Sequence, residues 1–256
     1  MKKLDTRIQK SFANTLSFYK EIGIELIISN EKKNKKKLLE TKEDNILMDC
    51  EQDPYSISNK ANDIEELENS FKNFKGCNLK KTSTNFVRFL GNVTSKLLII
   101  DGPPDKEEDK TGVSFVSNKG VLFEKMLNAI DLNKNDVFVV KCIPWRPPGN
   151  RYPTTEEIKT CRPFILNLIR LMKPRIIVCL GEIPTNQILN LNKSIVKVRG
   201  KWQLLNSEKI NKFDQTKHEF LVLPTLSISH LLIRPDLKKH AWEDMKLLRD
   251  KIREIL

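Results

Sequence analysis

Short apolar runs alternate with helical patterns along residues 96–256 of the chain. Each run is bounded by turn residues, as buried strands are, and the runs occupy 96–100, 136–141, 175–181 and 220–225. Helical periodicity lies between and after them, at 119–130, 154–172, 183–190 and 238–256. Such alternation indicates a mostly parallel sheet with helices on both faces, so the sequence predicts a three-layer α/β fold.

Ligands in such folds bind in the crevice at the carboxyl ends of the parallel strands. The loops that follow the four predicted strands begin after Ile100, Lys141, Gly181 and Thr225. We therefore expect any active site to lie among these loops.

The N-terminal part of the chain lacks this alternation. Residues 1–28 are predicted to form an amphipathic helical arm, in which Asp5 is an N-cap and Gly23 a stop. Residues 29–62 contain the run "EKKNKKK" and no periodicity, which is typical of a flexible linker. The α/β domain is then expected to cover residues 63–256.

The chain is strongly basic. Its 45 Lys and Arg against 33 Asp and Glu give a formal net charge of +12, which favours a polyanionic partner such as nucleic acid. A genome poor in G and C would also enrich Lys and Asn. No apolar run approaches the roughly 20 residues of a membrane span, and five scattered cysteines do not suggest a disulfide framework. The sequence predicts a soluble, cytoplasmic protein, expected to be a monomer.

The loops resemble those of family 4 uracil-DNA glycosylases over about residues 64–250. The resemblance rests on "GCNLKKTSTNF" (76–86), "LLIIDGPPDKEEDKTGVSFV" (97–116) and "PWRPPGNRYPTTEEIKTC" (144–161), followed by "VRGKW" (198–202) and "SHLLIRPDLKKHAWEDMK" (229–246). The N-terminal arm is similar to that of alphaproteobacterial members. The resemblance implies a uracil-DNA glycosylase-like α/β fold, DNA as the partner, and hydrolysis of the N-glycosidic bond of a flipped-out base.

The motif after the first strand usually reads Gly-Glu-Ala-Pro-Gly in that family. Here the acidic position is Gly102, while Asp101 and Asp105 flank it and Pro104 keeps the proline. The resemblance makes Asp101 and Asp105 the candidate catalytic acids and Pro104 a base-binding candidate. For Glu107 and Glu108 two roles stay open: positioning a water molecule, or acting as solvated loop acids that cap the next helix.

The base-binding positions are Phe115 and Lys141. Phe115 matches the ring on which uracil stacks, although a core phenylalanine would show the same pattern. Lys141 stands where the family has an asparagine that reads the uracil edge, and a lysine donates hydrogen bonds but cannot accept them. Recognition of uracil by paired donor and acceptor is therefore not expected here.

The last motif usually contains a His-Pro-Ser sequence, whose histidine stabilises the departing base. Ser227 occupies the histidine position and His230 lies three residues further on. Ser227 is a weaker, neutral donor, and His230 reaches the base only if the loop is shifted. Both remain catalytic candidates. Compared with the family motifs, the acidic residue, the residue that reads the uracil edge and the donor to the departing base have all changed.

Candidate DNA contacts follow from the same motifs. Surface or loop-bracing roles remain equally open for the arginines, and the phosphate-binding candidates are Arg146, Arg151, Lys201 and Arg234. The Leu231–Leu232 pair occupies the region that wedges into the duplex in this family.

Many family 4 enzymes hold a [4Fe-4S] cluster on four cysteines. Cys77 and Cys161 match two of the positions, but Phe74 and Trp145 occupy the other two. Cys142 would supply a third ligand only after a loop rearrangement. We therefore expect no cluster, and we expect Cys161 to be a buried thiol on the apolar face of helix 154–172.

Two functions remain open. In the first, the protein is an active DNA glycosylase with a rearranged acid, acting on uracil or on another deaminated base. In the second, it is a catalytically silent DNA-binding member of the fold. A relic that binds neither DNA nor base is a third, blander alternative.

Overall fold

The computed structural model describes residues 53–206 and 219–255. The predicted arm at 1–28 and the linker up to residue 52 lie outside the described residues. Residues 54–59, inside the segment expected to be linker, form helix α3 (Pro54–Asn59), whose N-cap is Asp53. The predicted linker therefore includes a helix within the described residues.

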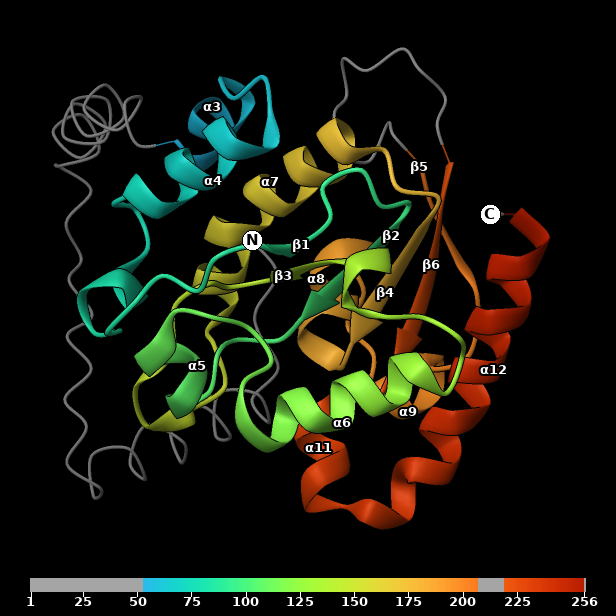
Figure 1. Cartoon of the computed structure of the whole chain (residues 1–256). Coiled ribbons are helices and arrows are strands. Elements are labelled where there is room, and N and C mark those ends of the chain that lie inside the picture. The colour runs from blue at the N-terminus through green and yellow to red at the C-terminus, as the bar shows by residue number, and fades with distance from the viewer. Residues whose placement is uncertain (1–52, 207–218, 256) are drawn as a thin grey trace, which may run out of the picture. The chain divides into compact units, whose positions relative to one another are not determined.

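A six-stranded sheet forms the centre of the domain (Figure 1). Its order is β1-β3-β2-β4-β6-β5, built from β1 (Leu90–Gly91), β2 (Leu97–Asp101), β3 (Phe138–Lys141), β4 (Ile176–Leu180), β5 (Gln203–Asn206) and β6 (Glu219–Thr225). The four strands β3, β2, β4 and β6 run parallel, and the edge strands β1 and β5 pair antiparallel to their neighbours. The four predicted strands are these parallel ones, whereas the sequence did not indicate the two edge strands.

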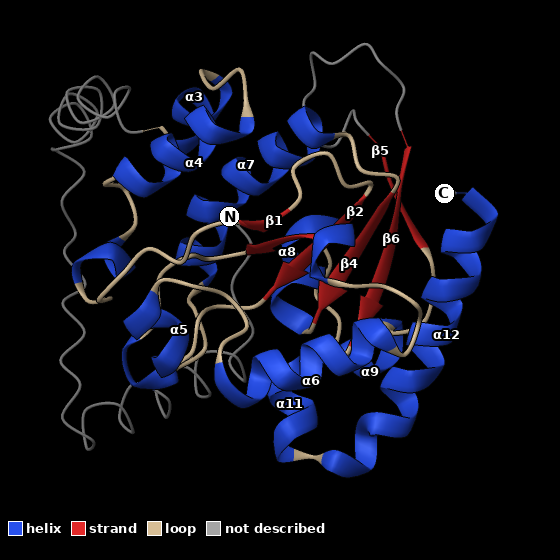
Figure 2. Cartoon of the chain, in the orientation of Figure 1, coloured by secondary structure: helices blue, strands red, loops and turns tan. Residues whose placement is uncertain are grey.

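Helices cover both faces of the sheet (Figure 2). On one face lie α4 (Ile64–Asn73), α7 (Thr155–Met172) and α8 (Glu182–Leu189), with α3 packed on α7. On the other lie α6 (Ser117–Asn128), α11 (Ile228–Ile233) and α12 (Lys238–Ile255). The helices α5 (Lys106–Thr111) and α9 (Ile195–Val198) and four 3₁₀ turns complete the described chain: η1 (Asn78–Lys81), η2 (Lys134–Asp136), η3 (Pro148–Asn150) and η4 (Pro235–Leu237). The predicted three-layer α/β fold is confirmed.

The central strands are buried on both faces because their apolar side chains alternate between two cores. Leu98 and Ile100 of β2 point into the core beneath α4 and α7, while Leu97 and Ile99 point into the core beneath α6 and α12. This is why the strands are continuous apolar runs rather than alternating ones. None of the helices in the described ranges has the length and apolarity that a membrane span requires.

Helix α7 begins as the sequence indicates. The Thr154 hydroxyl accepts from the Glu157 backbone N–H at 3.1 Å, and the Glu157 carboxylate accepts from the Thr154 N–H at 2.7 Å. This capping box fixes the first turn of the helix. Cys161 then points into the core and is fully buried, as its place on the apolar face predicts.

Candidate functional site

An open cleft of about 430 Å³ lies at the carboxyl ends of the parallel strands. Figure 1 shows α9 and α11 close to this end of β4 and β6. The cleft is lined by Asp101, Gly102, Pro103, Lys119, Tyr152, Leu180, Gly181, Glu182, Ile183, Pro184, Ser194, Ile195, Val196, Ser227, Ser229 and His230. Three of the four predicted catalytic residues therefore line one cleft, at the edge of the sheet where the sequence places it.

A buried cluster of four charges, the ion cluster, includes Asp101 and Lys119 from the lining of this cleft. It consists of Asp101, Glu108, Lys119 and Lys141, each at most 5% exposed. Lys141 Nζ donates to Asp101 Oδ2 at 2.7 Å and to both Glu108 oxygens at 2.7 Å. Lys119 Nζ lies 3.0 Å from Asp101 Oδ2 and 3.0 Å from Glu108 Oε2. Two ammonium groups and two carboxylates thus balance in charge inside the protein.

The ion cluster holds Asp101 and Lys119 in the charged form. Burial alone would raise the pKa of Asp101, but the Coulombic attraction of Lys119 and Lys141 outweighs it and lowers this pKa to about 2. Burial alone would lower the pKa of Lys119, but Asp101 and Glu108 raise it above the usual lysine value. Asp101 is consequently ionised at neutral pH and a weak proton acceptor.

The cluster follows from the parallel pairing of β2 and β3. Asp101 and Lys141 are direct partners in the register, both at the last position of their strands. Glu108 reaches them from α5, and Lys119 from the first turn of α6. Glu108 is fully buried, which excludes the solvated alternative at this position, although Glu108 does belong to a capping box.

Phe115 lies directly against the ion cluster. Its ring stacks on Phe123 at a centroid distance of 4.0 Å, and Nζ of Lys141 and of Lys119 lie over the ring at 5.2 and 5.6 Å from its centroid. The backbone N–H of Phe115 donates to Glu108 Oε1 at 2.7 Å. The ring is only 5% exposed, so Phe115 is a core residue in this structure and leaves no open face for a base.

The two other candidates of this motif have local roles. Asp105 is the N-cap of α5 and accepts hydrogen bonds from the backbone N–H groups of Glu107 and Glu108, both at 3.0 Å. Pro104 is buried beside it. The neighbouring Pro103 lines the cleft, whereas Pro104 is not among the lining residues.

Ser227 and His230 also belong to the lining of the cleft. The Ser227 hydroxyl caps α11 by accepting from the His230 backbone N–H at 3.2 Å. The His230 side chain is exposed and faces the cleft. Gly181 has a φ of 103°, and a Cβ there would lie 3.0 Å from Ser227 Cβ, so this strand end can approach α11 only as glycine.

The candidate phosphate contacts are braced locally. Arg151 pairs with both Glu157 oxygens at 2.9 and 2.6 Å, and Arg234 pairs with the Asp236 carboxylate at 3.0 and 2.9 Å. Arg146 Nε donates to Asn150 Oδ1 at 2.6 Å. Lys201 is exposed and donates to the Lys197 carbonyl at 3.3 Å.

The Leu231–Leu232 pair is only partly exposed. Leu231 is buried at 1% exposure, whereas Leu232 and Ile233 are 40% and 78% exposed. The apolar side chains that protrude after the cleft are therefore Leu232 and Ile233.

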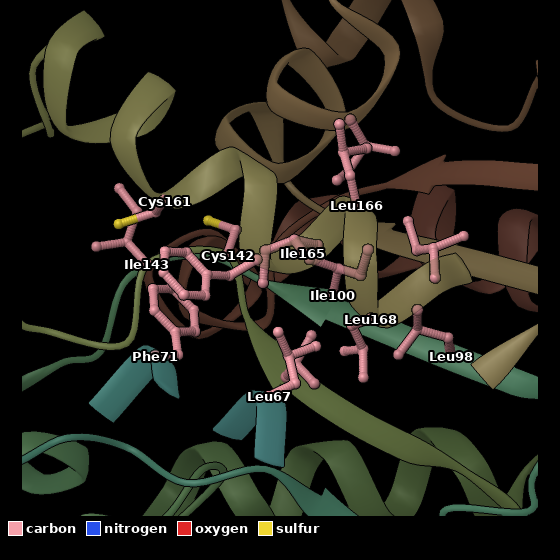
Figure 3. Close-up of a cluster of buried hydrophobic side chains, with 14 of the residues drawn as sticks. Leu67, Phe71, Leu98, Ile100, Cys142, Ile143, Cys161, Ile165, Leu166 and Leu168 are labelled. Atoms are coloured by element: carbon pink, nitrogen blue, oxygen red, sulfur yellow. The ribbon is translucent and has the colours of Figure 1, made fainter. Parts of the chain in front are cut away.

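Aromatic side chains fill the region of the cluster cysteines. Trp145 packs edge-on against Phe71 at 5.4 Å, Phe71 stacks on Phe164 at 4.2 Å, and Phe74 lies 5.1 Å from Phe164. Figure 3 shows Phe71 together with Cys142 and Cys161 in this core.

These residues do not fit a four-cysteine iron–sulfur cluster. Trp145 and Phe74 are 1% and 3% exposed and stand at two of the four ligand positions. Within residues 53–206 and 219–255, no three His, Cys, Asp or Glu side chains are placed to share a metal ion. Burial raises the pKa of the Cys142 and Cys161 thiols, whereas the hydrogen bond with Cys161 lowers the pKa of Cys77.

Sequence reasoning missed Lys119 and Tyr152. Lys119 carried no distinguishing signal, because α6 also contains the charged residues Glu124 and Lys125. Tyr152 lines the cleft at 57% exposure and lies inside the quoted "RPPGNRYP" motif.

Residues 89–246 match the family model described as the uracil DNA glycosylase superfamily. The type-4 uracil-DNA glycosylase of Thermotoga maritima is 31% identical over 197 residues, which cover 75% of this chain and 95% of that protein. The type-4 enzyme of Sulfurisphaera tokodaii is 31% identical over 73% of this chain and 84% of its own length. That of Archaeoglobus fulgidus is 28% identical over 72% and 90%. With this match and the α/β fold around the cleft, the chain belongs to the uracil-DNA glycosylase superfamily.

Proposed function

We propose that this protein is a DNA repair protein that binds DNA across the cleft and does not excise uracil. Its relatives are named as uracil-DNA glycosylases, which supports a role in DNA repair. We also propose that the protein acts as a monomer in the cytoplasm. The observation that carries it is the position of Lys141.

Lys141 stands at the uracil-reading position implied by the family resemblance. Its ammonium group is bound by both Asp101 and Glu108, and the side chain is 1% exposed. An ammonium group has no acceptor lone pair, and all of this one's hydrogen bonds point to carboxylates. A uracil edge would have to displace two hydrogen-bonded carboxyl groups from a buried lysine.

The stacking position is closed as well. Phe123 and the two ammonium groups lie against the Phe115 ring, so a base could reach the ring only by opening the ion cluster. Separating buried ion pairs leaves uncompensated charge, which costs several kcal/mol. The geometry thus favours a pocket that stays closed to a flipped-out uracil.

DNA binding is supported by charge and shape. The chain carries a net charge of +12, and Leu232 and Ile233 protrude beside the cleft, where an apolar wedge would separate stacked bases. Phosphate contacts by Arg146 and Lys201 remain part of the proposal.

The test pairs an excision assay with a binding assay. Oligonucleotides that contain uracil, hypoxanthine or xanthine are incubated with the protein, and abasic sites are revealed by alkaline cleavage. Binding is followed by fluorescence anisotropy at several salt concentrations. We expect salt-dependent binding without abasic sites, whereas release of uracil by the wild-type protein would refute the proposal.

A second candidate function is excision of another deaminated base. One observation favours it: the Asp101 carboxylate lines the cleft and is ionised, so it can orient a water molecule. The water oxygen would bond to the sugar C1′, the N-glycosidic bond would break, and the base would leave with the electron pair and take up a proton. Excision of hypoxanthine or xanthine that is lost in Asp101→Asn, with an unchanged circular dichroism spectrum, would support this candidate instead.

A further inference from the structure

We infer that the cleft takes the base of an unpaired nucleotide onto the ring of Tyr152, and that the protein therefore prefers single-stranded to duplex DNA. This inference rests on the proposed DNA-binding function and names the form of DNA that the cleft accepts. It assigns to Tyr152 the stacking role that the buried Phe115 ring does not have here.

Tyr152 has the properties of a stacking platform. Its side chain lines the cleft and is 57% exposed, although aromatic side chains of this size usually bury more of their surface. Aromatic rings bind bases of any sequence because every base has an apolar face.

The backbone around Tyr152 is held in place on both sides. The Arg151 guanidinium donates to the Tyr152 carbonyl at 3.0 Å and to the Glu157 carboxylate in the first turn of α7. Pro153, which follows, is buried. A ring on a braced segment loses little conformational freedom when a base stacks on it.

The cleft offers both surfaces that a base requires. Apolar walls come from Ile183, Ile195 and Val196, and polar groups come from Ser229 and His230. Bases are apolar on their faces and polar on their edges, so this mixture suits them. A volume of about 430 Å³ also lies in the range of small-ligand sites.

Exposed lysines stand next to the walls of the cleft. Lys193 immediately precedes, and Lys197 immediately follows, the lining segment 194–196, and both are exposed. Cations at these positions would contact the phosphates on either side of a bound nucleotide.

The preference for unpaired nucleotides follows from how the base reaches the Tyr152 ring. In a duplex both faces of a base are covered by its stacked neighbours, so Tyr152 can stack only on a base that has left the helix. Unpaired bases reach the ring without the cost of unstacking, which is a few kcal/mol per base. Single-stranded DNA should therefore bind more tightly than a duplex of the same length.

The experiment measures the fluorescence anisotropy of a labelled oligo(dT) strand and of its DNA duplex with oligo(dA). For the wild-type protein we expect tighter binding of the single strand. Tyr152→Ala should weaken single-strand binding roughly five- to 150-fold, the effect of losing one stacked base, while Tyr152→Phe should retain it. Tyr55→Ala is the matched control, because Tyr55 is 46% exposed on α3 and does not belong to the cleft lining.

Two results would overturn the inference while leaving the proposed function intact. One is wild-type protein that binds the duplex as tightly as the single strand. The other is Tyr152→Ala protein that binds the single strand as tightly as wild type. If the wild type binds neither DNA, the proposed function itself fails. Thermal unfolding of Tyr152→Ala that matches wild type would show that lost affinity does not reflect misfolding.

Discussion

Replacing Lys141 by methionine tests whether the ion cluster is a closed, charge-balanced unit. Methionine has a similar length and no charge, so Lys141→Met removes the ammonium group and little volume. Asp101 and Glu108 would then share Lys119 alone, at 3.0 Å from each. One buried carboxylate would be left without a counter-charge.

Removing one partner of a buried ion pair destabilises a protein by about 3–5 kcal/mol, and that range applies because Lys141 is fully buried. With a urea m-value of about 2 kcal/mol/M, the midpoint of unfolding should fall by roughly 2 M. The double variant Asp101→Asn with Lys141→Met leaves Glu108 and Lys119 as a single balanced pair. It should recover at least about 1 kcal/mol relative to Lys141→Met.

Urea unfolding followed by circular dichroism measures these differences, with equal m-values as the sign of two-state behaviour. Lys134→Met is the control, because Lys134 pairs with Glu124 at the surface and both are nearly half exposed. It should change stability by less than about 0.5 kcal/mol. A midpoint for Lys141→Met equal to that of Lys134→Met would refute the reasoning.

Three further outcomes are expected. Asp101 has a folded-state pKa of about 2, below its ordinary value. Its contribution to the free energy of unfolding is therefore present above about pH 4 and lost as the pH falls towards 2. Acid unfolding should show a smaller pH dependence in the double variant Asp101→Asn/Lys141→Met than in wild type. Trp145→Ala should lower the free energy of unfolding by about 3–5 kcal/mol in urea titrations, because Trp145 is fully buried among aromatic rings, and an effect below about 1 kcal/mol would contradict that packing role. Ile233→Asp should weaken DNA binding in anisotropy titrations without changing thermal stability, since Ile233 is 78% exposed, and unchanged affinity would exclude it as a wedge.

The sequence predicts the fold well because its signals are local. The run 96–100 became β2 at Leu97–Asp101, and the helical pattern at 154–172 became α7 at Thr155–Met172. Both depend on residues that follow one another in the chain. The edge strands β1 and β5 were missed because they are short and only partly apolar.

The site was predicted only in outline because its interactions are distant in sequence. Lys141 binds carboxylates that lie 40 and 33 residues before it, at Asp101 and Glu108. Charged side chains are almost never fully buried unless they are paired. A lysine at a strand end does not reveal from sequence alone whether it is buried or which carboxylates pair with it. The same applies to Phe115, whose sequence pattern fits a base-stacking ring and a core ring equally well.

The balance of the ion cluster also restricts how this protein could evolve. Lys141→Asn would place an amide at the reading position, yet it would leave Asp101 and Glu108 competing for Lys119. Each single substitution that removes one of the four charges leaves a buried unpaired charge, and only joint substitutions avoid it. Under the proposed function, a lineage that carries this cluster reaches an amide at position 141 only through joint substitutions that keep the buried charges balanced.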